Sequence, residues 1–275
     1  MATFLRYPGF KRKAVTLSYD DAVDFDKKLI EIMGEYGLKG TFNVNHAGIG
    51  KDGWHSMSED ELFKMYLDSG NEIAVHGAEH FSLGEVDVAM ATRDILLNRE
   101  FLEKKTGGIV RGMAYANGSC DQRIADIVKN CGIVYARTVN STRSFELPKN
   151  WLLLDPTTHH ADSQLDSLVD RFLSIDKYRY MWSNSPKLFY LWGHSFEFET
   201  GNNWHIIEDF AKKISGREDI WYATNIEIYN YVSAYDSLIY SCDGSIITNP
   251  TCTDIYLEYF GKEIIVPAGQ SVMAR

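Results

Sequence analysis

The sequence has little of what membrane-spanning or disulfide-rich secreted proteins need. Its longest apolar runs, such as WLLL at 151–154, are far shorter than the roughly 20 residues that cross a bilayer. The N-terminal segment has no apolar signal core, because charged residues interrupt it from Arg6 onward. The four cysteines show no C-x-x-C spacing, and a chain this long needs no disulfide framework. These absences predict a cytoplasmic protein with free thiols and no membrane segment.

Positive charge is also scarce. The 275 residues include 28 Lys and Arg against 38 Asp and Glu, which gives a formal net charge of −10. Nucleic acids and anionic membrane surfaces are recognised by clustered basic side chains, so neither is an expected partner. The 45% hydrophobic content excludes disorder as the main state. We therefore expect a globular protein with a small or neutral partner, and the oligomeric state stays open.

Short β-type runs alternate with helix-length segments over most of the chain, which is typical of α/β folds with a parallel sheet or barrel. The expected strands are 13–19, 40–45, 72–76, 109–115, 133–137, 151–155, 187–193 and 219–223. The expected helices begin after residue 21 and end near Gly37, and then cover 58–69, 87–105, 121–130, 161–175 and 203–215. The S-x-x-E sequence at Ser58 matches a helix capping box.

The pattern changes near residue 235. From there, alternating β-type runs are broken by the turn pairs Asp243-Gly244 and Gly261-Lys262. This tail is too short to fold alone. We therefore expect a barrel domain over 1–235 and a β-rich extension over 236–275 that packs on it.

Polar side chains gather where the expected strands end. In (β/α) barrels this rim collects side chains from several strands around one concavity. The residues at or just after strand ends are Asp20, Asp21, His76, His80, Tyr115, Asn117, Arg137, Asp155, His159, His160 and His194. The rim is therefore the expected functional site.

One aspartate and two histidines of this set, Asp21, His76 and His80, are suited to a divalent metal. A metal lowers the pKa of its bound water to about 7, and Asp20 would then be available as a base. An alternative for Asp20-Asp21 is that they cap the helix that follows, where carboxylates meet the positive end of the helix dipole.

The segment HGAEH at 76–80 also matches H-x-x-E-H, a metalloprotease signature in which both histidines lie on one helix and Glu79 acts as the base. The strand-like EIAV before it and Gly77 within it disfavour a continuous helix. A protease is therefore the weaker interpretation.

Three motifs in chain order resemble those of the polysaccharide deacetylase family, the NodB-homology domain of carbohydrate esterase family four. LSYDD at 17–21 resembles T-F-D-D, HGAEH at 76–80 resembles H-[ST]-x-x-H, and LWGH at 191–194 resembles L-x-x-H. The resemblance covers roughly residues 13–230. It implies a distorted (β/α) barrel of seven or eight parallel strands.

The resemblance also implies roles for individual residues. Asp20 corresponds to the catalytic base, Asp21, His76 and His80 correspond to the metal ligands, and His194 corresponds to the general acid. The implied metal is zinc, with cobalt or nickel as alternatives. Gly77 stands where the family has Ser or Thr.

The middle motifs depart from the family pattern. RGMAYANG at 111–118 matches either R-x-P-Y, with Arg111 in register, or F-A-Y-P-x-G, which has no arginine there. The second match places Tyr115 and Asn117 at the rim, with a backbone N–H near Asn117 as oxyanion donor. Arg137 would then supply positive charge near Asp20.

No clean counterpart of the family's aspartate-tryptophan motif is present. The nearest segment, WLLLDPTTHH at 151–160, makes Asp155 and His160 candidates, and a polar loop that caps the helix from Asp162 is an equal alternative. The roles of Asp155, His159 and His160 stay open.

The implied activity is hydrolysis of N-acetyl or O-acetyl groups on a carbohydrate by a metal-bound water, with an acetylated sugar or oligosaccharide as substrate. Two alternatives stay open. One is a carbohydrate-binding barrel without activity, and the other is a metal-independent amidohydrolase like the allantoinases.

Overall fold

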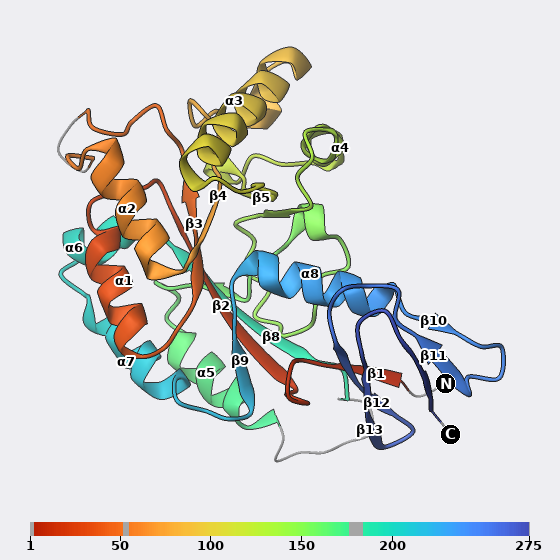
Figure 1. Cartoon of the computed structure of the whole chain (residues 1–275). Helices are drawn as coiled ribbons and strands as arrows, with labels where there is room; N and C mark the ends of the chain where they lie inside the picture. Colours follow the sequence, from red (N-terminus) through yellow and green to blue (C-terminus); the bar gives the residue numbers. More distant parts are fainter. Residues whose placement is uncertain (1–2, 52–54, 176–183, 275) are drawn as a thin grey trace.

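A computed structural model describes residues 3–51, 55–175 and 184–274. Eight parallel strands form its main sheet, and they curl into a distorted barrel (Figure 1). The strands are β2 (Lys13–Asp20), β3 (Gly40–Val44), β4 (Glu72–Val75), β5 (Gly112–Ala114), β6 (Tyr135–Arg137), β7 (Thr158–His159), β8 (Lys187–Gly193) and β9 (Ile220–Tyr222). The α/β barrel implied by the sequence is confirmed.

The order of the main sheet is β6-β5-β4-β3-β2-β8-β7. β9 pairs with the first residues of β2, and β3 pairs with its last residues, so both share one side of β2. Leu154 forms an isolated parallel bridge with Arg137 of β6, through backbone hydrogen bonds with Ala136 and Thr138. Because all strands run parallel, their carboxyl ends meet at one rim.

Helices flank this barrel in Figure 1. They are α1 (Asp26–Glu35), α2 (Glu59–Ser69), α3 (Val88–Thr106), α4 (Gln122–Asn130), α5 (Leu165–Leu173), α6 (Ser195–Thr200), α7 (His205–Ile214) and α8 (Asn225–Asp236). The capping box expected at Ser58 is present, because its hydroxyl accepts from Glu61 N–H while the Glu61 carboxylate accepts from Ser58 N–H. Apolar faces of α1 to α7 pack on the strands in one core cluster, whereas α8 packs in a second cluster that includes residues from both ends of the chain.

Several elements differ from the sequence expectations. The short strands β1 (Thr3–Arg6) and β7 are not among the expected ones. The prediction of a strand at 151–155 is wrong, because residues Trp151–Leu153 form a 3₁₀ turn that the Asn150 side chain caps. α6 and α8 were not expected. α6 has only six residues, too few for a periodic pattern, and α8 is rich in aromatic and β-branched residues, which weaken helix propensity.

The chain after residue 236 forms five short strands. They are β10 (Ile239–Tyr240), β11 (Ile246–Thr248), β12 (Ile255–Tyr259), β13 (Lys262–Val266) and β14 (Ser271–Met273). The N-terminal strand β1 (Thr3–Arg6) pairs with β12, so both ends of the chain build one small sheet. Glu258 of β12 also forms ion pairs with Arg6 and Arg12, at 2.7 and 2.9 Å, just before β2 begins.

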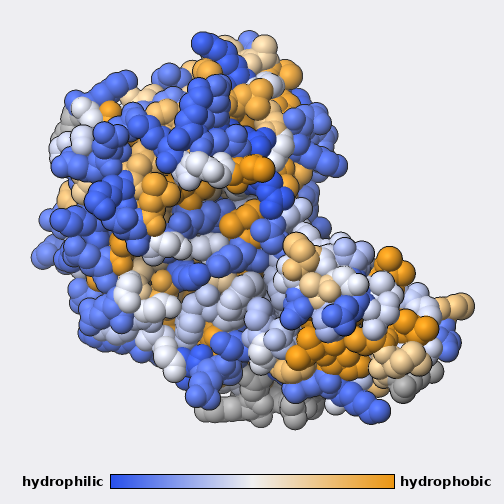
Figure 2. Space-filling view, viewed as in Figure 1, coloured by the Kyte–Doolittle hydropathy of each residue, from blue (hydrophilic) through white to orange (hydrophobic). Residues whose placement is uncertain are grey.

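Apolar side chains gather on the visible surface of these C-terminal strands (Figure 2). The exposed ones include Ile239, Phe260 and Met273. Among the helices of the described residues, none combines the length and the apolar character that crossing a bilayer requires.

Candidate active site

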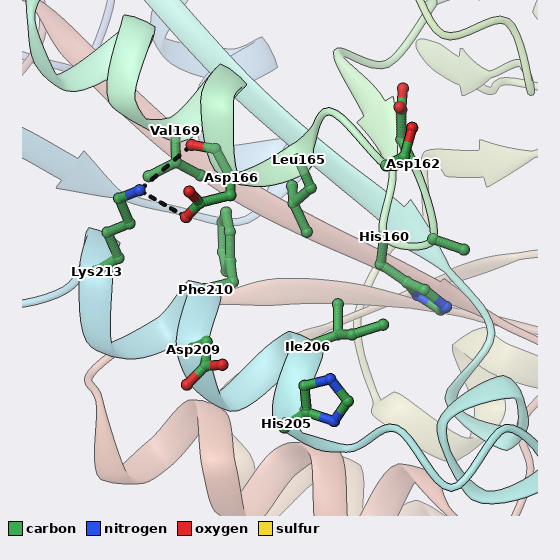
Figure 3. A pocket seen from close by; sticks show the side chains of 12 residues that line it. His160, Asp162, Leu165, Asp166, Val169, His205, Ile206, Asp209, Phe210 and Lys213 are labelled. Atoms are coloured by element: carbon green, nitrogen blue, oxygen red, sulfur yellow. Dashed lines mark hydrogen bonds and ion pairs between the residues drawn. The ribbon is translucent and has the colours of Figure 1, made fainter.

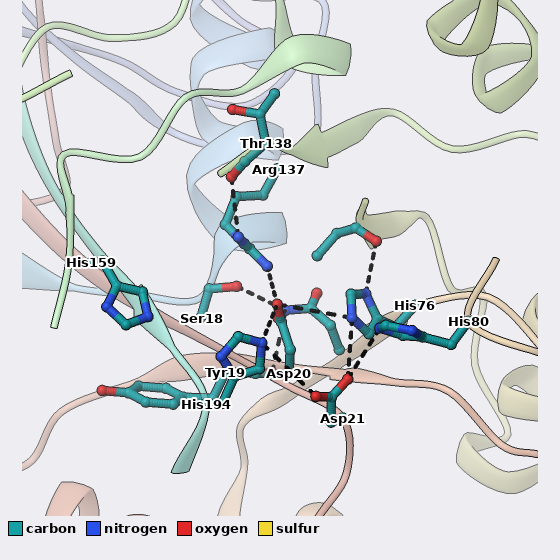
Figure 4. A network of polar contacts seen from close by, with 12 residues as sticks. Ser18, Tyr19, Asp20, Asp21, His76, His80, Arg137, Thr138, His159 and His194 are labelled. Carbon is teal, nitrogen blue, oxygen red and sulfur yellow. Dashed lines mark hydrogen bonds and ion pairs between the residues drawn. The ribbon is translucent and has the colours of Figure 1, made fainter. Parts of the chain in front are cut away.

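The carboxyl ends of β2, β4, β6 and β8 bring the predicted site residues together (Figure 4). Asp20 ends β2 and Asp21 follows it, His76 follows β4, Arg137 ends β6, and His194 follows β8. The dashed contacts in Figure 4 join these side chains into one network. Residues far apart in the sequence therefore share a single concave rim, as the strand-end argument predicts.

Asp21 faces two imidazoles. Its Oδ1 lies 3.4 Å from His76 Nε2 and 3.3 Å from His80 Nε2. His76 Nδ1 lies 2.9 Å from the Ala114 carbonyl oxygen, which can only accept, so Nδ1 carries the hydrogen. The Nε2 of neutral His76 therefore presents a lone pair to a carboxylate oxygen. That arrangement is repulsive unless a proton or a metal cation lies between the two atoms.

The spacing of these three atoms fits a metal. Ligands about 2.0–2.1 Å from a tetrahedral zinc lie about 3.3–3.4 Å from one another. Oδ1 of Asp21 is buried and accepts no hydrogen bond that meets normal geometry among the described residues. Burial would raise the pKa of Asp21, but His76 and His80 outweigh it and lower that pKa well below its usual range. The donor set therefore fits a divalent cation.

Two of these three residues have an unusual backbone. Asp21 has φ 81° and His80 has φ 56°, in the left-handed region that non-glycine residues seldom adopt. Such a conformation costs of order 1–3 kcal/mol and persists where the surroundings fix it. The backbone is thus held in a form that turns both side chains toward one point.

Asp20 is 2% exposed, and each of its carboxylate oxygens has a polar partner. Its Oδ2 contacts Nη2 of Arg137, and its Oδ1 accepts from Asn43 Nδ2 at 2.8 Å. The Arg137 guanidinium lies 4.4 Å from the centroid of the Trp192 ring, a cation–π distance. The carboxylate is therefore fixed in place and compensated by a buried positive charge.

His194 reaches the same two carboxylates. Its Nε2 lies 3.9 Å from Asp20 Oδ2 and 3.8 Å from Asp21 Oδ2. On the other side of the ring, Nδ1 lies 3.0 Å from Glu197 Oε1. Burial would lower the pKa of His194, but Glu197 and the two aspartates raise it. Glu197 is a site residue that the sequence analysis missed.

The space around Gly77 leaves no room for a side chain. It has φ 86°, and a Cβ built on it would lie 2.4 Å from Oδ2 of Asp94. The other carboxylate oxygen of Asp94 accepts the Glu79 N–H at 2.8 Å. Asp94, which lies on α3, thus occupies the space that a Ser or Thr side chain would fill and holds the loop that carries His76 and His80.

Two alternatives from the sequence are wrong. Asp20 and Asp21 do not cap α1, because that helix begins at Asp26 with Phe25 as its N-cap. The segment 76–80 is not helical, and Glu79 is exposed. The helical geometry of the H-x-x-E-H proteases is therefore absent from these residues.

The remaining candidates lie in different surroundings. Tyr115 directly follows β5, and its side chain is 1% exposed and donates its hydroxyl to the Leu152 carbonyl. Asn117 has φ 55°, and its amide donates to Ser82. Arg111 contacts Asn230 of α8, away from Asp20. Asp155 accepts from the Thr138 hydroxyl.

A separate cavity of about 350 Å³ lies between α5 and α7 (Figure 3). Leu165, Val169 and Phe210 give it an apolar wall, and Lys213 at its edge is bound by Asp166. The residues that line it include His160 but none of Asp20, Asp21, His76, His80 and His194. It is therefore distinct from the candidate metal site.

The family model described as polysaccharide deacetylase matches residues 8–136. This span includes both aspartates of β2 and both histidines after β4, and it ends before Arg137 and His194. Residues 8–136 therefore belong to the polysaccharide deacetylase family, which confirms the family that the motifs indicate.

Solved structures of low sequence identity share the fold. A predicted polysaccharide deacetylase from Mycobacterium smegmatis is 18% identical with a TM-score of 0.62, and the match covers 86% of this chain and 95% of that one. PuuE allantoinase is 12% identical with a TM-score of 0.60, covering 82% and 91%. A family 4 carbohydrate esterase pseudoenzyme from Bacillus anthracis is 15% identical with a TM-score of 0.50, covering 82% and 68%.

No curated protein matches the sequence. The three structural neighbours have different activities, so the fold alone does not define the reaction. The function has to be argued from the side chains at the rim.

Proposed function

We propose that this protein is a metal-dependent hydrolase that removes acetyl groups, N-linked or O-linked, from a carbohydrate. The observation that carries the proposal is the Asp21–His76–His80 triangle, in which Asp21 Oδ1 lies 3.3–3.4 Å from both imidazole Nε2 atoms and faces the lone pair of His76, an arrangement that suits a divalent cation. When bound there, zinc, cobalt or nickel would supply Lewis acidity toward an acyl oxygen and water.

Asp20 is the proposed general base. Its carboxylate is held by Arg137 and Asn43 beside the metal triangle, 3.9 Å from His76 Nε2. A carboxylate in that position accepts the proton of an attacking water molecule. Arg137 compensates the negative charge of the Asp20 carboxylate, and it does not itself meet the substrate because it is fully buried.

His194 is the proposed general acid. Its Nε2 faces the same carboxylates from the end of the neighbouring strand β8, and the side chain is 23% exposed, so a substrate can reach it. A proton on Nε2 passes to the departing amine or alcohol when the acyl bond breaks. The backbone N–H near Asn117 remains the proposed donor to the oxyanion.

Acetate release from N-acetylated chito-oligosaccharides and O-acetylated xylo-oligosaccharides tests this proposal. Asp20→Asn and His194→Ala should each lower kcat by about two to four orders of magnitude, because each removes a proton-transfer group. Glu79→Gln is a matched control, since Glu79 is exposed and adjoins the site without facing it. Wild-type rates in both site variants would refute the roles.

The two alternatives predict other results. A carbohydrate-binding barrel would bind the oligosaccharides without releasing acetate. An allantoinase-like enzyme would open allantoin and keep that activity after treatment with a chelator. The triangle of Asp21, His76 and His80 favours the metal-dependent reaction over both alternatives.

A further inference from the structure

Three imidazoles converge on one carboxylate beside the candidate metal site. Glu197 of α6 lies 3.0 Å from His194 Nδ1 through its Oε1. Its Oε2 lies 3.2 Å from His159 Nε2 and 2.8 Å from His160 Nε2. Glu197 follows His194 by three residues, which places both on one face at the start of α6.

The hydrogen positions in this cluster can be deduced. His159 Nδ1 accepts the Ala161 N–H at 3.1 Å, so the hydrogen of neutral His159 is on Nε2 and points at Glu197. An ionised carboxylate only accepts hydrogen bonds. Burial would raise the pKa of Glu197, but the three imidazoles lower it well below its usual range. Glu197 is therefore a carboxylate that accepts three N–H groups.

A second metal site is the alternative interpretation of this cluster, since His159, His194 and Glu197 also offer ligand atoms close to one another. The spacings separate the two clusters. Glu197 is 2.8–3.2 Å from its imidazole nitrogens, the range of hydrogen bonds. Asp21 is 3.3–3.4 Å from its own, the range of ligands around a tetrahedral cation.

Packing holds two sides of the cluster rigid. The His160 ring is stacked between Phe198 and Tyr19, with centroids 4.1 and 5.8 Å away. A Cβ on Gly193 would lie 2.1 Å from His160 Nδ1, so only glycine admits this ring. Ser195 ties the start of α6 to Asp26 by a hydrogen bond of 2.5 Å.

We propose that Glu197 is the positioning residue of His194: by accepting the Nδ1 hydrogen, it fixes the tautomer and holds Nε2 toward Asp20 and Asp21. The inference rests on the proposed function of His194. Glu197 lies behind the ring and acts on the substrate only through it. His159 and His160 anchor the carboxylate, which explains why three histidines surround one acid.

Glu197→Gln tests the proposal, because a glutamine side chain has the same size and shape as glutamate but carries no charge. Two N–H donors share Oε2, so the amide oxygen should turn to His159 and His160 and the NH₂ group to His194. His194 would then present a lone pair at Nδ1 and carry its hydrogen on Nε2. Acetate release from penta-N-acetylchitopentaose should show kcat lowered about 10–100-fold with KM changed less than threefold.

The matched control is Glu199→Gln on the same helix. Glu199 accepts from Trp204 and does not contact a histidine of the cluster among the described contacts. Its kcat should equal that of the wild type. Equal kcat values for Glu197→Gln and Glu199→Gln would overturn the proposal.

Nitrogen-15 NMR of histidine-labelled protein at pH 9 gives a readout independent of turnover. The His194 signals, identified by their loss in His194→Gln, should show hydrogen on Nδ1 in the wild type and on Nε2 in Glu197→Gln. This result supports the inference even if no acetylated sugar is a substrate, in which case only the proposed function fails. An unchanged tautomer, or two zinc ions per wild-type chain and one in Glu197→Gln, would overturn it.

Discussion

Arg137 of β6 contacts the carboxylate of Asp20 on β2, and both side chains are almost completely buried. The two strands lie four places apart in the sheet order, so the contact crosses the inside of the curled sheet. Asp20 has one further hydrogen-bond donor, Asn43. Removal of the guanidinium would leave a buried carboxylate without its countercharge.

Arg137→Ala should therefore lower both stability and turnover. Loss of one partner from a buried ion pair costs about 3–5 kcal/mol, because the remaining charge stays desolvated. Urea unfolding should show this loss, and Asp20→Asn in the Arg137→Ala background should recover part of it, because the two residues share one interaction. Arg111→Ala, which removes an arginine outside the site, is the control. Additive costs in the double variant would contradict the pairing.

Gly77 and Asp94 form a second testable pair. Gly77→Ala places a methyl group against the Asp94 carboxylate at a positive φ, so it should destabilise the fold by at least about 1 kcal/mol and weaken binding of zinc through His76 and His80. Asp94→Ala in the same chain removes the clash. Zinc titration of the two single variants and the double variant measures the coupling. A loss of zinc affinity in the double variant that equals or exceeds the sum of the two single losses would count against it.

Much of this site follows from the sequence, and the rest depends on contacts that the sequence does not mark. Asp20, His76 and Arg137 are recognisable because polar residues at strand ends of a barrel must meet at one rim. Glu197 was missed because α6 is too short to be expected, although its place three residues after His194 is a usable signal. Asp94 lies in the middle of a helix, where nothing in the local pattern indicates a partner at Gly77.

The same limit applies to the fold. The strand of β8 was predicted at its observed bounds because KLFYLWG is a continuous buried run. The pairing of β1 with β12 joins segments about 250 residues apart. Local periodicity carries no information on such pairing.

Asp26 predicts a pH dependence of stability. It is buried in α1, where burial raises its pKa to about 7 although Ser195 and Tyr66 donate hydrogen bonds to it. The folded state therefore binds this proton more tightly than the unfolded state, whose pKa is near 3.8. Its stabilising effect is full below pH 3.8 and is lost as the pH rises to about 7.

Asp26→Asn keeps the shape and removes the titration. The variant should gain stability relative to the wild type as the pH rises from about 4 to about 7, by at most about 1.4 kcal/mol per pH unit, and the difference should level off above pH 7. Urea unfolding at several pH values measures the difference. Glu72, whose pKa burial also raises to about 7, stays in both proteins and cancels in the comparison. A difference independent of pH would contradict the assignment.

The central claim is that Asp21, His76 and His80 hold one catalytic divalent cation. Metal content per chain, measured by mass spectrometry on protein purified without a chelator, tests it most directly. We expect about one zinc, cobalt or nickel ion in the wild type and in His159→Asn, and none in His76→Ala. No bound metal in the wild type after reconstitution, or equal content in His76→Ala, would contradict it.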